Sequence, residues 1–255
     1  GPLFAMFDEG ISVPTSYNDV VDLGSLYRSD ASLRPIGVKR NVARAKDLAL
    51  LLFTTTTDGK TLAVKVTNRR WLLAALATAA GCQLSSRDTV YCCFPLHHAM
   101  TILIGVGGAL AGRSRLVLAQ SFDARNFWDE VRRTGSTVIP YSGSMCRALV
   151  DTPKHEVDRK HPVRLFLGSG LRAEPWEALI DRFGPLDVLE FYASPDANLV
   201  LANLTGKKPG SVGRQAFPTG ELVLVREDPT SKRLLRGPEG WLRRAAVGEP
   251  GRLLS

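Results

Sequence analysis

From residue 47 onward, hydrophobic and polar positions along this chain follow two alternating patterns. Short apolar runs predict buried strands, and apolar residues spaced three and four positions apart predict helices that pack by one face. The predicted strands are 48–53, 61–66, 88–94, 115–118, 138–140, 164–167 and 187–192. The predicted helices are 68–81, 98–112, 123–134, 142–150 and 175–183. Because strands and helices largely alternate along the chain, we expect an α/β fold with a mostly parallel sheet flanked by helices.

The two ends of the chain do not share this alternation. The first part is polar and irregular, with weak periodicity. Near the end, short strands at 220–225 and 241–244 stand between turns rich in Gly and Pro and predict a small β-rich portion. The expected parts are therefore a lead-in segment at 1–46, an α/β core at 47–208 and a β-rich segment at 209–255.

The composition is that of a folded globular chain with a basic surface. With 44% hydrophobic and 23% charged residues among 255, the chain can bury a sizeable core. Its formal net charge of +8 predicts attraction to acidic partners, such as nucleotides, CoA-like phosphates or anionic membrane surfaces. The basic residues stand in scattered pairs without interleaved aromatic residues, so the sequence does not favour a nucleic-acid partner.

Cysteine spacing and hydropathy argue against two further classes of protein. The four cysteines lack C-x-x-C spacing and the density of a secreted scaffold, and Cys92 and Cys93 lie in a predicted buried strand. They are expected to be reduced core thiols of a cytoplasmic protein. The apolar stretch 94–112 contains two histidines, a proline and four glycines, and it predicts a buried helix rather than a membrane span.

Three loops that follow predicted strands carry candidate chemistry. Ligands of an open parallel sheet bind beyond the carboxyl ends of its strands, where loops and helix N-termini present unpaired N–H groups. The loops are 54–59 (T-T-T-T-D-G), 168–172 (G-S-G-L-R) and 191–196 (F-Y-A-S-P-D). The first loop can cradle phosphates, or it can simply turn a hairpin at Asp58-Gly59, and the residues alone leave both interpretations open.

Taken in order, these loops and the segments between them resemble the adenylate-forming acyl-CoA synthetases. The resemblance is greatest to the branch of fatty-acid transport proteins and very-long-chain acyl-CoA synthetases. The likeness covers about residues 48–214. The family's motifs are answered by 54–62 (T-T-T-T-D-G-K-T-L), 95–101 (P-L-H-H-A-M-T), 127–132 (F-W-D-E-V-R), 137–147 (T-V-I-P-Y-S-G-S-M-C-R), 168–176 (G-S-G-L-R-A-E-P-W), 190–198 (E-F-Y-A-S-P-D-A-N) and 210–214 (G-S-V-G-R).

The resemblance implies part of the large N-terminal domain of such a synthetase and a reaction in two steps. A fatty acid is joined to ATP as an acyl-adenylate with release of pyrophosphate, and the thiol of CoA then displaces AMP. The implied ligands are ATP or AMP, Mg²⁺, a fatty acid and CoA. The resemblance further implies a middle segment of a longer parent chain, which lacks the C-terminal lobe with its catalytic lysine and is inactive alone. A cytoplasmic location with peripheral membrane association is expected.

The same resemblance assigns the candidate site residues. The phosphate-binding candidates are Thr54, Thr55, Thr57, Gly59 and Lys60. The adenine-binding candidates are Gly168, Ser169, Gly170, Phe191 and Tyr192, and the acyl-pocket candidates are Tyr141 and Gly143. The catalytic candidates are His98 and Asp196, of which Asp196 is also the candidate Mg²⁺ ligand. Hydroxyls and backbone N–H groups suit phosphate oxygens, and an aromatic strand end suits a flat base.

Several positions depart from the family's pattern. In the phosphate loop, Asp58 replaces a threonine and Leu62 replaces the lysine, while Lys60 stands two positions away. A carboxylate beside polyphosphate costs on the order of a few kcal/mol unless a metal intervenes. Pro195 replaces a threonine, and Asp196 replaces the glutamate with a side chain one methylene shorter. These departures keep a second function open: a non-catalytic domain that binds acyl chains or nucleotide, or a scaffold within a larger lipid-metabolising protein.

For some candidates a structural role stays open beside the functional one. His98 either lies where acyl chain and adenylate meet or caps the following helix. Tyr141 and Gly143 either line an acyl tunnel or belong to the core. Arg172 either approaches a phosphate or forms a surface ion pair, and the tryptophans at 128 and 176 are expected to pack in the core.

Overall fold

The computed structural model of the chain describes residues 3–5, 20–22, 43–55, 59–195, 199–216 and 221–254. By their contacts the residues form two units, Gly1–Ala43 and Arg44–Ser255. In the first unit, strands β1 (Leu3–Ala5) and β2 (Val20–Asp22) pair in parallel. The features that bear on function lie in the second unit. The expected three-part division of the chain stays a prediction.

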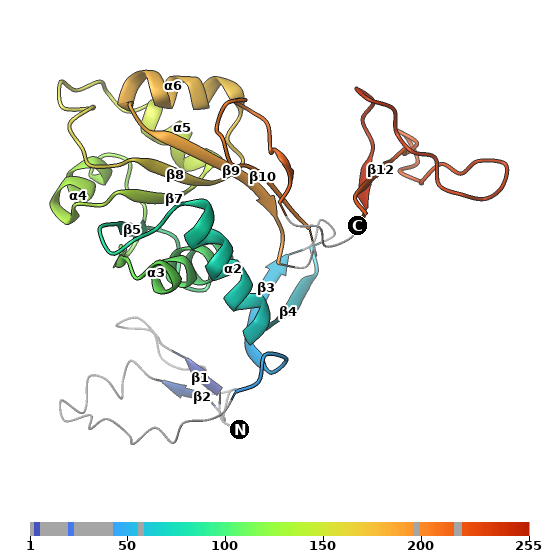
Figure 1. The fold of residues 1–255 in the computed structure, drawn as a ribbon, viewed down its shortest axis with the longest axis horizontal. Helices are drawn as coiled ribbons and strands as arrows, with labels where there is room; N and C mark the ends of the chain where they lie inside the picture. The colour runs from blue at the N-terminus through green and yellow to red at the C-terminus, as the bar shows by residue number, and fades with distance from the viewer. Residues whose placement is uncertain are drawn as a thin grey trace. The chain divides into compact units, whose positions relative to one another are not determined.

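The main element of the second unit is a seven-stranded sheet in the order β11-β10-β9-β8-β7-β5-β6 (Figure 1). Its parallel strands are β5 (Thr89–Cys92), β6 (Arg115–Leu118), β7 (Val138–Ser142), β8 (Leu165–Ser169) and β9 (Asp187–Ala193). Two short strands, β10 (Val200–Asn203) and β11 (Arg214–Gln215), continue the sheet in antiparallel orientation. The predicted mostly parallel sheet is confirmed, and the two antiparallel strands were not predicted.

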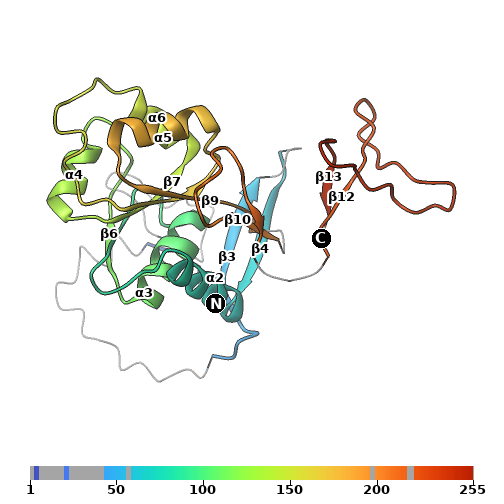
Figure 2. The same cartoon turned by 45° about the horizontal axis from the view of Figure 1, so that its top comes forward.

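Helices flank this sheet on both faces, as Figures 1 and 2 show. The helices of one face are α4 (Phe127–Thr134), α5 (Gly143–Val150) and α6 (Ala173–Phe183). The other face is covered by the end of α2 (Asn68–Gly81), the π-helical segment η1 (Met100–Val106) and α3 (Gly107–Gly112). Successive side chains of a strand point to opposite faces. On β7, accordingly, Ile139 and Tyr141 pack toward α4–α6, whereas Val138 packs on the opposite face.

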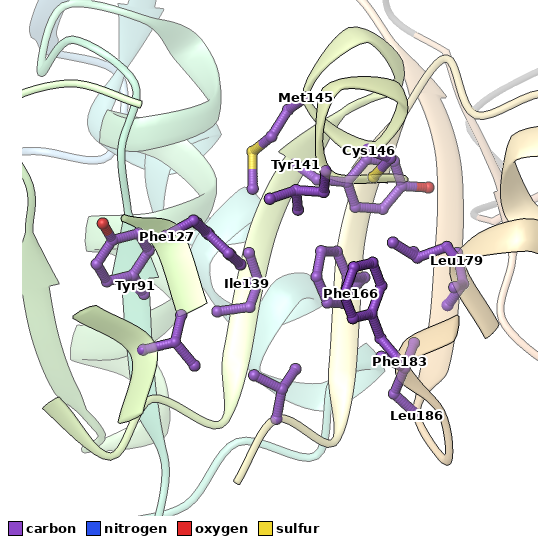
Figure 3. Close-up of a cluster of buried hydrophobic side chains, with 14 of the residues drawn as sticks. Tyr91, Phe127, Ile139, Tyr141, Met145, Cys146, Phe166, Leu179, Phe183 and Leu186 are labelled. Atoms are coloured by element: carbon purple, nitrogen blue, oxygen red, sulfur yellow. The ribbon is translucent and has the colours of Figure 1, made fainter. Parts of the chain in front are cut away.

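The larger hydrophobic cluster lies between the sheet and α4–α6 and is rich in aromatic residues (Figure 3). Phe127 of α4 stands edge-on to Tyr91 of β5, with ring centroids 5.6 Å apart. Phe166 of β8 is fully buried, and burial of such a ring contributes about 1.5–3 kcal/mol. Trp128 and Trp176 are also buried, so the packing role expected for both tryptophans is confirmed.

Helix starts follow local capping rules. Ser142 at the end of β7 caps α5, because its hydroxyl accepts a hydrogen bond from the amide of Met145 at 3.3 Å. The start of α2 is capped in the same way. Thr67 is the cap and accepts from the amide of Arg70 at 3.3 Å, whereas the side chain of Asn68 donates to the carbonyl of Arg44 at 3.0 Å.

Strands β3 (Leu48–Thr55) and β4 (Thr61–Thr67) form a separate two-stranded antiparallel sheet, which confirms the predicted hairpin. Leu52 and Val66 on its inner face are buried against Leu103 of η1. Phe53 points the other way and is 70% exposed. The hairpin is therefore packed on one side only among the described residues.

The last part of the chain contains a two-stranded antiparallel sheet of β12 (Val223–Val225) and β13 (Arg252–Leu254). The predicted strand 241–244 is not a strand. Leu242 and Arg244 form only isolated bridges, to Arg236 and Val225 respectively. Because only single residues pair here, the segment lacks the continuous ladder of hydrogen bonds that makes a strand.

The four cysteines are all unpaired and buried, which confirms that they are thiols of the core. Burial raises the pKa of the Cys82 and Cys92 thiols to about 12, so both stay protonated at neutral pH. Within the described part of the chain, no helix combines the length and the hydropathy needed to cross a membrane.

Candidate functional site

The candidate site lies at the carboxyl edge of the main sheet. Strand β5 stands between β6 and β7, so the order of the sheet reverses there, and open α/β sheets bind ligands at such a reversal. A pocket of about 290 Å³ opens at this point. It is lined by Phe94, Phe122, Ser142, Ser144 and Met145. The aromatic and thioether side chains make the pocket suited to an apolar group, and the hydroxyls of Ser142 and Ser144 hydrogen-bond to each other at 3.0 Å.

Next along the same edge is a buried carboxylate that the sequence analysis did not select. Glu190 of β9 is only 2% exposed. One carboxylate oxygen accepts hydrogen bonds from the amides of Gly170 at 2.6 Å and Leu171 at 3.2 Å. The hydroxyl of Tyr141 donates to the other oxygen. A lone charged residue in the apolar run 188–192 was the signal that could have pointed to it.

Burial sets the protonation of this group. It raises the pKa of the Glu190 carboxyl above its ordinary value, and the hydrogen bonds from Tyr141, Gly170 and Leu171 oppose that rise. Burial, followed by the neighbouring Glu190 charge, also raises the pKa of the Tyr141 phenol. The phenol therefore remains a hydrogen-bond donor at neutral pH. Tyr141 is fully buried and contributes to the core, as one of its two interpretations had it.

The adenine-binding candidates come together at this edge. The strand register pairs Gly168 with both Tyr141 and Glu190, so the turn after β8 lies level with Phe191 and Tyr192 at the end of β9. Phe191 is half-buried against the core cluster that contains Val138, on the opposite face of the sheet from α4–α6. Tyr192 is 44% exposed. The edge therefore presents one accessible aromatic ring beside a glycine-rich turn.

Backbones approach closely at this turn. A Cβ atom at Gly143 would lie 1.9 Å from the carbonyl oxygen of Gly170, and Gly170 has a φ of +87°. Only glycine tolerates both conditions without moving the backbone. Gly143, an acyl-pocket candidate, is thus required by the packing of the start of α5 against the turn. Ser169 ends β8 next to it.

The phosphate-binding candidates lie on the hairpin. Thr54 and Thr55 end β3 and face Leu62 and Thr61 across the hairpin. Gly59 has a φ of +82° and open space around it, and Lys60 beside it is exposed. Thr57 and Asp58 lie outside the described residues. The described residues on either side of 56–58 pair as two strands of a hairpin, and a phosphate-binding role stays a prediction.

A comparison with known families decides the assignment. The chain matches the family described as AMP-binding enzyme over residues 9–249. The chain belongs to the AMP-binding enzyme family. This result confirms the resemblance noted from the ordered motifs.

Among curated proteins, relatives of this AMP-binding family member include fatty-acid ligases and transport proteins. It is 38% identical over 216 residues to the medium/long-chain-fatty-acid–CoA ligase FadD6 of Mycobacterium tuberculosis, covering 84% of this chain and 36% of the relative. It is 34% identical over 212 residues to human long-chain fatty acid transport protein 3, covering 82% of this chain and 31% of the relative. The chain thus spans about a third of the length of these relatives.

Solved structures of adenylate-forming proteins share the fold. O-succinylbenzoate coenzyme A synthetase (MenE) of Bacillus subtilis, in complex with AMP, superposes with a TM-score of 0.72 at 17% identity, covering 98% of this chain and 49% of that one. MatB of Rhodopseudomonas palustris, bound to ATP, superposes with a TM-score of 0.62 at 22% identity, covering 76% of this chain and 38% of that one. At such identities the likeness establishes the fold of the AMP-binding family member.

His98 of the family member begins the segment that leads into η1. Its Nδ1 accepts a hydrogen bond from the amide of Met100 at 3.1 Å, whereas the N-cap of η1 is Ala99, without a side-chain capping bond, so the capping role considered for His98 is not confirmed. Its ring also stacks on Phe94, a pocket-lining residue, with centroids 5.4 Å apart. Partial burial and the nearby His97 lower the pKa of His98. A neutral imidazole therefore lies beside the pocket, and its catalytic role stays a prediction.

Two other candidates of the family member are less defined. Asp196, the candidate Mg²⁺ ligand, lies outside the described residues. Among the residues that the structure describes, no three metal-binding side chains form a group. Arg172 is exposed at the N-cap of α6 and forms no ion pair with another described residue. The ion pair at this helix start is made by Arg147, whose guanidinium binds Glu174 through both terminal nitrogens.

Proposed function

We propose that the chain is the nucleotide- and acyl-binding core of a fatty-acid–CoA ligase. One observation carries this proposal. An apolar pocket of about 290 Å³, the glycine-rich turn and the exposed Tyr192 all lie along the carboxyl edge of the main sheet. An apolar pocket suits an acyl chain, and an exposed aromatic ring suits a nucleotide base. The names of the relatives agree with such a pair of ligands.

The proposed reaction joins two substrates and then exchanges a group. The fatty carboxylate attacks the α-phosphorus of ATP, pyrophosphate leaves, and an acyl-adenylate forms. The thiol of CoA then attacks the acyl carbon, AMP leaves, and the thiol proton is released. This chain would hold and orient the acyl-adenylate at the switch point, an arrangement that lowers the entropic cost of bringing the reacting groups together.

Each ligand has proposed partners on the chain. Tyr192 stacks on adenine, with Phe191 and the turn 168–170 beside it, and the phosphates lie against Thr54, Thr55, Thr57, Gly59 and Lys60. The acyl group enters the pocket, whose shape depends on the close approach at Gly143. Mg²⁺, when bound by Asp196, would neutralise charge on the phosphates. CoA is proposed as the acceptor in the second step, with no contact assigned to it.

Calorimetry on this chain tests the nucleotide part. Titration with ATP and MgCl₂, and with a non-hydrolysable acyl-adenylate analogue, should give saturable binding. The variant Tyr192→Leu should weaken both by about tenfold, because stacking of a base on an aromatic ring is worth about 1–3 kcal/mol. Trp241→Leu is the matched control, since Trp241 is also an exposed aromatic residue (77%) but belongs to the last part of the chain. No saturable binding by the unmodified chain would refute the proposal.

A second candidate function is favoured by the hairpin. Leu62 stands at the family's lysine position and is 42% exposed, so this position supplies no positive charge to a phosphate. The alternative is a non-catalytic domain that binds an acyl chain or nucleotide, or acts as a scaffold. ATP–pyrophosphate exchange by the complete parent protein decides between the two, since only a ligase incorporates labelled pyrophosphate into ATP when a fatty acid is added.

We further propose that the protein works in the cytoplasm with peripheral membrane association. The net charge of +8 and the buried free thiols support this proposal. Co-sedimentation with vesicles of anionic lipid, repeated at high salt, tests it. Electrostatic association should be lost at high salt, and binding that is absent at low salt would refute it.

A further inference from the structure

A single buried carboxylate connects three segments at the candidate nucleotide site. Glu190 accepts from the amides of Gly170 and Leu171, at 2.6 and 3.2 Å, and from the hydroxyl of Tyr141. These donors belong to the turn after β8 and to β7, whereas Glu190 itself belongs to β9. The carboxylate therefore ties the turn to both neighbouring strands.

Burial of this carboxylate is costly, so its contacts must be compensated. A charged group removed from water is tolerated when its oxygens are well hydrogen-bonded, and here both oxygens have donors. An apolar residue would fill the same space, but it would leave the Gly170 and Leu171 amides without an acceptor. The carboxylate thus has a specific task, which is to accept from the turn.

The turn cannot easily find a substitute for this contact. Gly143 approaches so closely that a Cβ there would lie 1.9 Å from the carbonyl oxygen of Gly170, so the start of α5 fills the space on that side. Leu171, just after the turn, is 2% exposed and packs in the larger cluster. The turn is therefore anchored on both sides, and the amide contacts with Glu190 define its middle.

We propose that Glu190 is a positioning residue for nucleotide binding, which it supports by holding the turn 168–171 through the Gly170 and Leu171 amides. The inference rests on the proposed function, because it assumes that adenine binds beside Tyr192 at this turn. Tyr141 is the third tie and orients the carboxylate. Glu190 does not touch the nucleotide; its effect passes through the backbone of the turn.

Three variants of the full chain test this role. Glu190→Leu removes the acceptor, Glu190→Gln keeps an acceptor oxygen for the two amides, and Tyr141→Phe removes only the orienting hydroxyl. The Kd for AMP, measured by calorimetry, should rise at least tenfold in Glu190→Leu, about threefold in Tyr141→Phe and less than threefold in Glu190→Gln. Backbone hydrogen exchange followed by NMR should accelerate at Gly170 and Leu171 in Glu190→Leu and stay slow in Glu190→Gln.

Tyr91→Phe is the matched control. Tyr91 is also a buried tyrosine of the same cluster whose hydroxyl donates to a glutamate, Glu130, at 2.6 Å. It lies on β5, away from the turn. Removal of the Tyr91 hydroxyl should affect stability as removal of the Tyr141 hydroxyl does. It should leave the Kd for AMP and the hydrogen exchange of the turn amides unchanged.

The outcomes separate this inference from the proposed function. If the unmodified chain binds no AMP, the proposed function fails and this inference fails with it. Suppose that the unmodified chain binds AMP, and that in Glu190→Leu the turn amides exchange rapidly while the Kd for AMP is unchanged. Glu190 is then only structural, and this inference alone is overturned. If Glu190→Leu does not fold, the pair Tyr141→Phe and Tyr91→Phe decides, and equal Kd values for AMP in both overturn the inference.

Discussion

Two parts of the candidate site are built in opposite ways. The turn 168–171 lies against a buried network, with its amides held by Glu190 and its neighbour Leu171 in the core. The hairpin β3–β4 is a two-stranded sheet that packs by one face, with Phe53 70% exposed on the other. A two-stranded sheet has little stability of its own. The difference indicates that the proposed base end of the site is held by the core and the proposed phosphate end by local contacts.

Some of the departures from the family pattern follow the same division, whereas Pro195 and Asp196 come after β9 in the sequence. Leu62 belongs to the hairpin and is 42% exposed, so a substitution there disturbs few packed neighbours. Gly168, Gly170 and Gly143 keep the family's residues at the turn, where backbones approach too closely for a side chain. Packing thus explains why these glycines are retained, while the exposed position of Leu62 has changed.

The largest expected effect contrasts a core ring with a hairpin ring. Phe166→Ala should lower the free energy of unfolding by about 3–5 kcal/mol, because the ring is fully buried and leaves a cavity. Phe53→Ala should change it by less than about 0.5 kcal/mol, since the ring is 70% exposed. Urea unfolding of the two variants measures both values. Similar losses would mean that the outer face of the hairpin is covered in solution.

A smaller effect is expected from two glycines in the same comparison. Gly143→Ala places a Cβ 1.9 Å from the carbonyl oxygen of Gly170 and should cost about 1–3 kcal/mol through backbone displacement. A Cβ added at Gly59 meets nothing within 4 Å. Gly59→Ala should therefore cost only the conformational strain of an alanine at a φ of +82°, about 1–2 kcal/mol.

Nucleotide binding separates these two variants further. Gly143→Ala should also raise the Kd for AMP, because the turn moves, whereas Gly59→Ala should not. Calorimetry with AMP measures the difference. Equal effects on AMP would contradict the assignment of the base end to the turn.

Much of this division could be read from the sequence. Strands buried on both faces appear as apolar runs, so β5, β7, β8 and β9 were predicted close to their observed limits. The antiparallel strands β10 and β11 were missed because each is short and pairs at the end of the sheet, where no long apolar run is needed.

The site was predicted less completely, for a physical reason. The glycine-rich turn and the loop with Tyr192 were noted because they follow predicted strands, and the family resemblance assigned them to adenine. Glu190 was not selected, because its significance comes from donors that lie far away in sequence, at Tyr141 and in the turn. The lone charge in the apolar run 188–192 marks Glu190 as unusual, but only the register of the folded sheet identifies its partners.

Acid should destabilise the main sheet through one buried carboxylate, that of Asp88. Asp88 before β5 accepts from Arg164 at 2.8 Å and from Thr137 at 2.9 Å. Burial opposes its ionisation, but these hydrogen bonds and that from Ser85 hold the pKa of Asp88 at about 2, against an ordinary value of 3.8. Because folding lowers this pKa, the ionised Asp88 stabilises the fold above pH about 4. This stabilisation is lost as the pH falls through about 2.

The variant Asp88→Asn tests this contribution. It should lower the free energy of unfolding at pH 7 by about 1–2 kcal/mol, since a hydrogen-bonded charge is lost from a nearly buried site. Its stability should change less between pH 4 and pH 2 than that of the unmodified chain. Urea unfolding across this pH range measures both effects, and an unchanged pH dependence would contradict the role given to Asp88.

The smallest effect is expected on the phosphate side. Leu62→Lys restores a positive charge at an exposed position of the hairpin, which faces Thr54 across the strands. An exposed charge pair contributes about 0.2–1 kcal/mol, so the Kd for ATP should fall by about two- to fivefold while that for AMP stays the same. Leu48→Lys is the matched control, since Leu48 is also exposed on β3 but pairs with Thr67 at the other end of the hairpin. If both lysines improve ATP binding equally, general attraction between charges explains the gain, and the phosphate-binding role of the hairpin is contradicted. If only Leu62→Lys does so, the hairpin holds the phosphates, and its lack of positive charge at this position is what separates it from the turn.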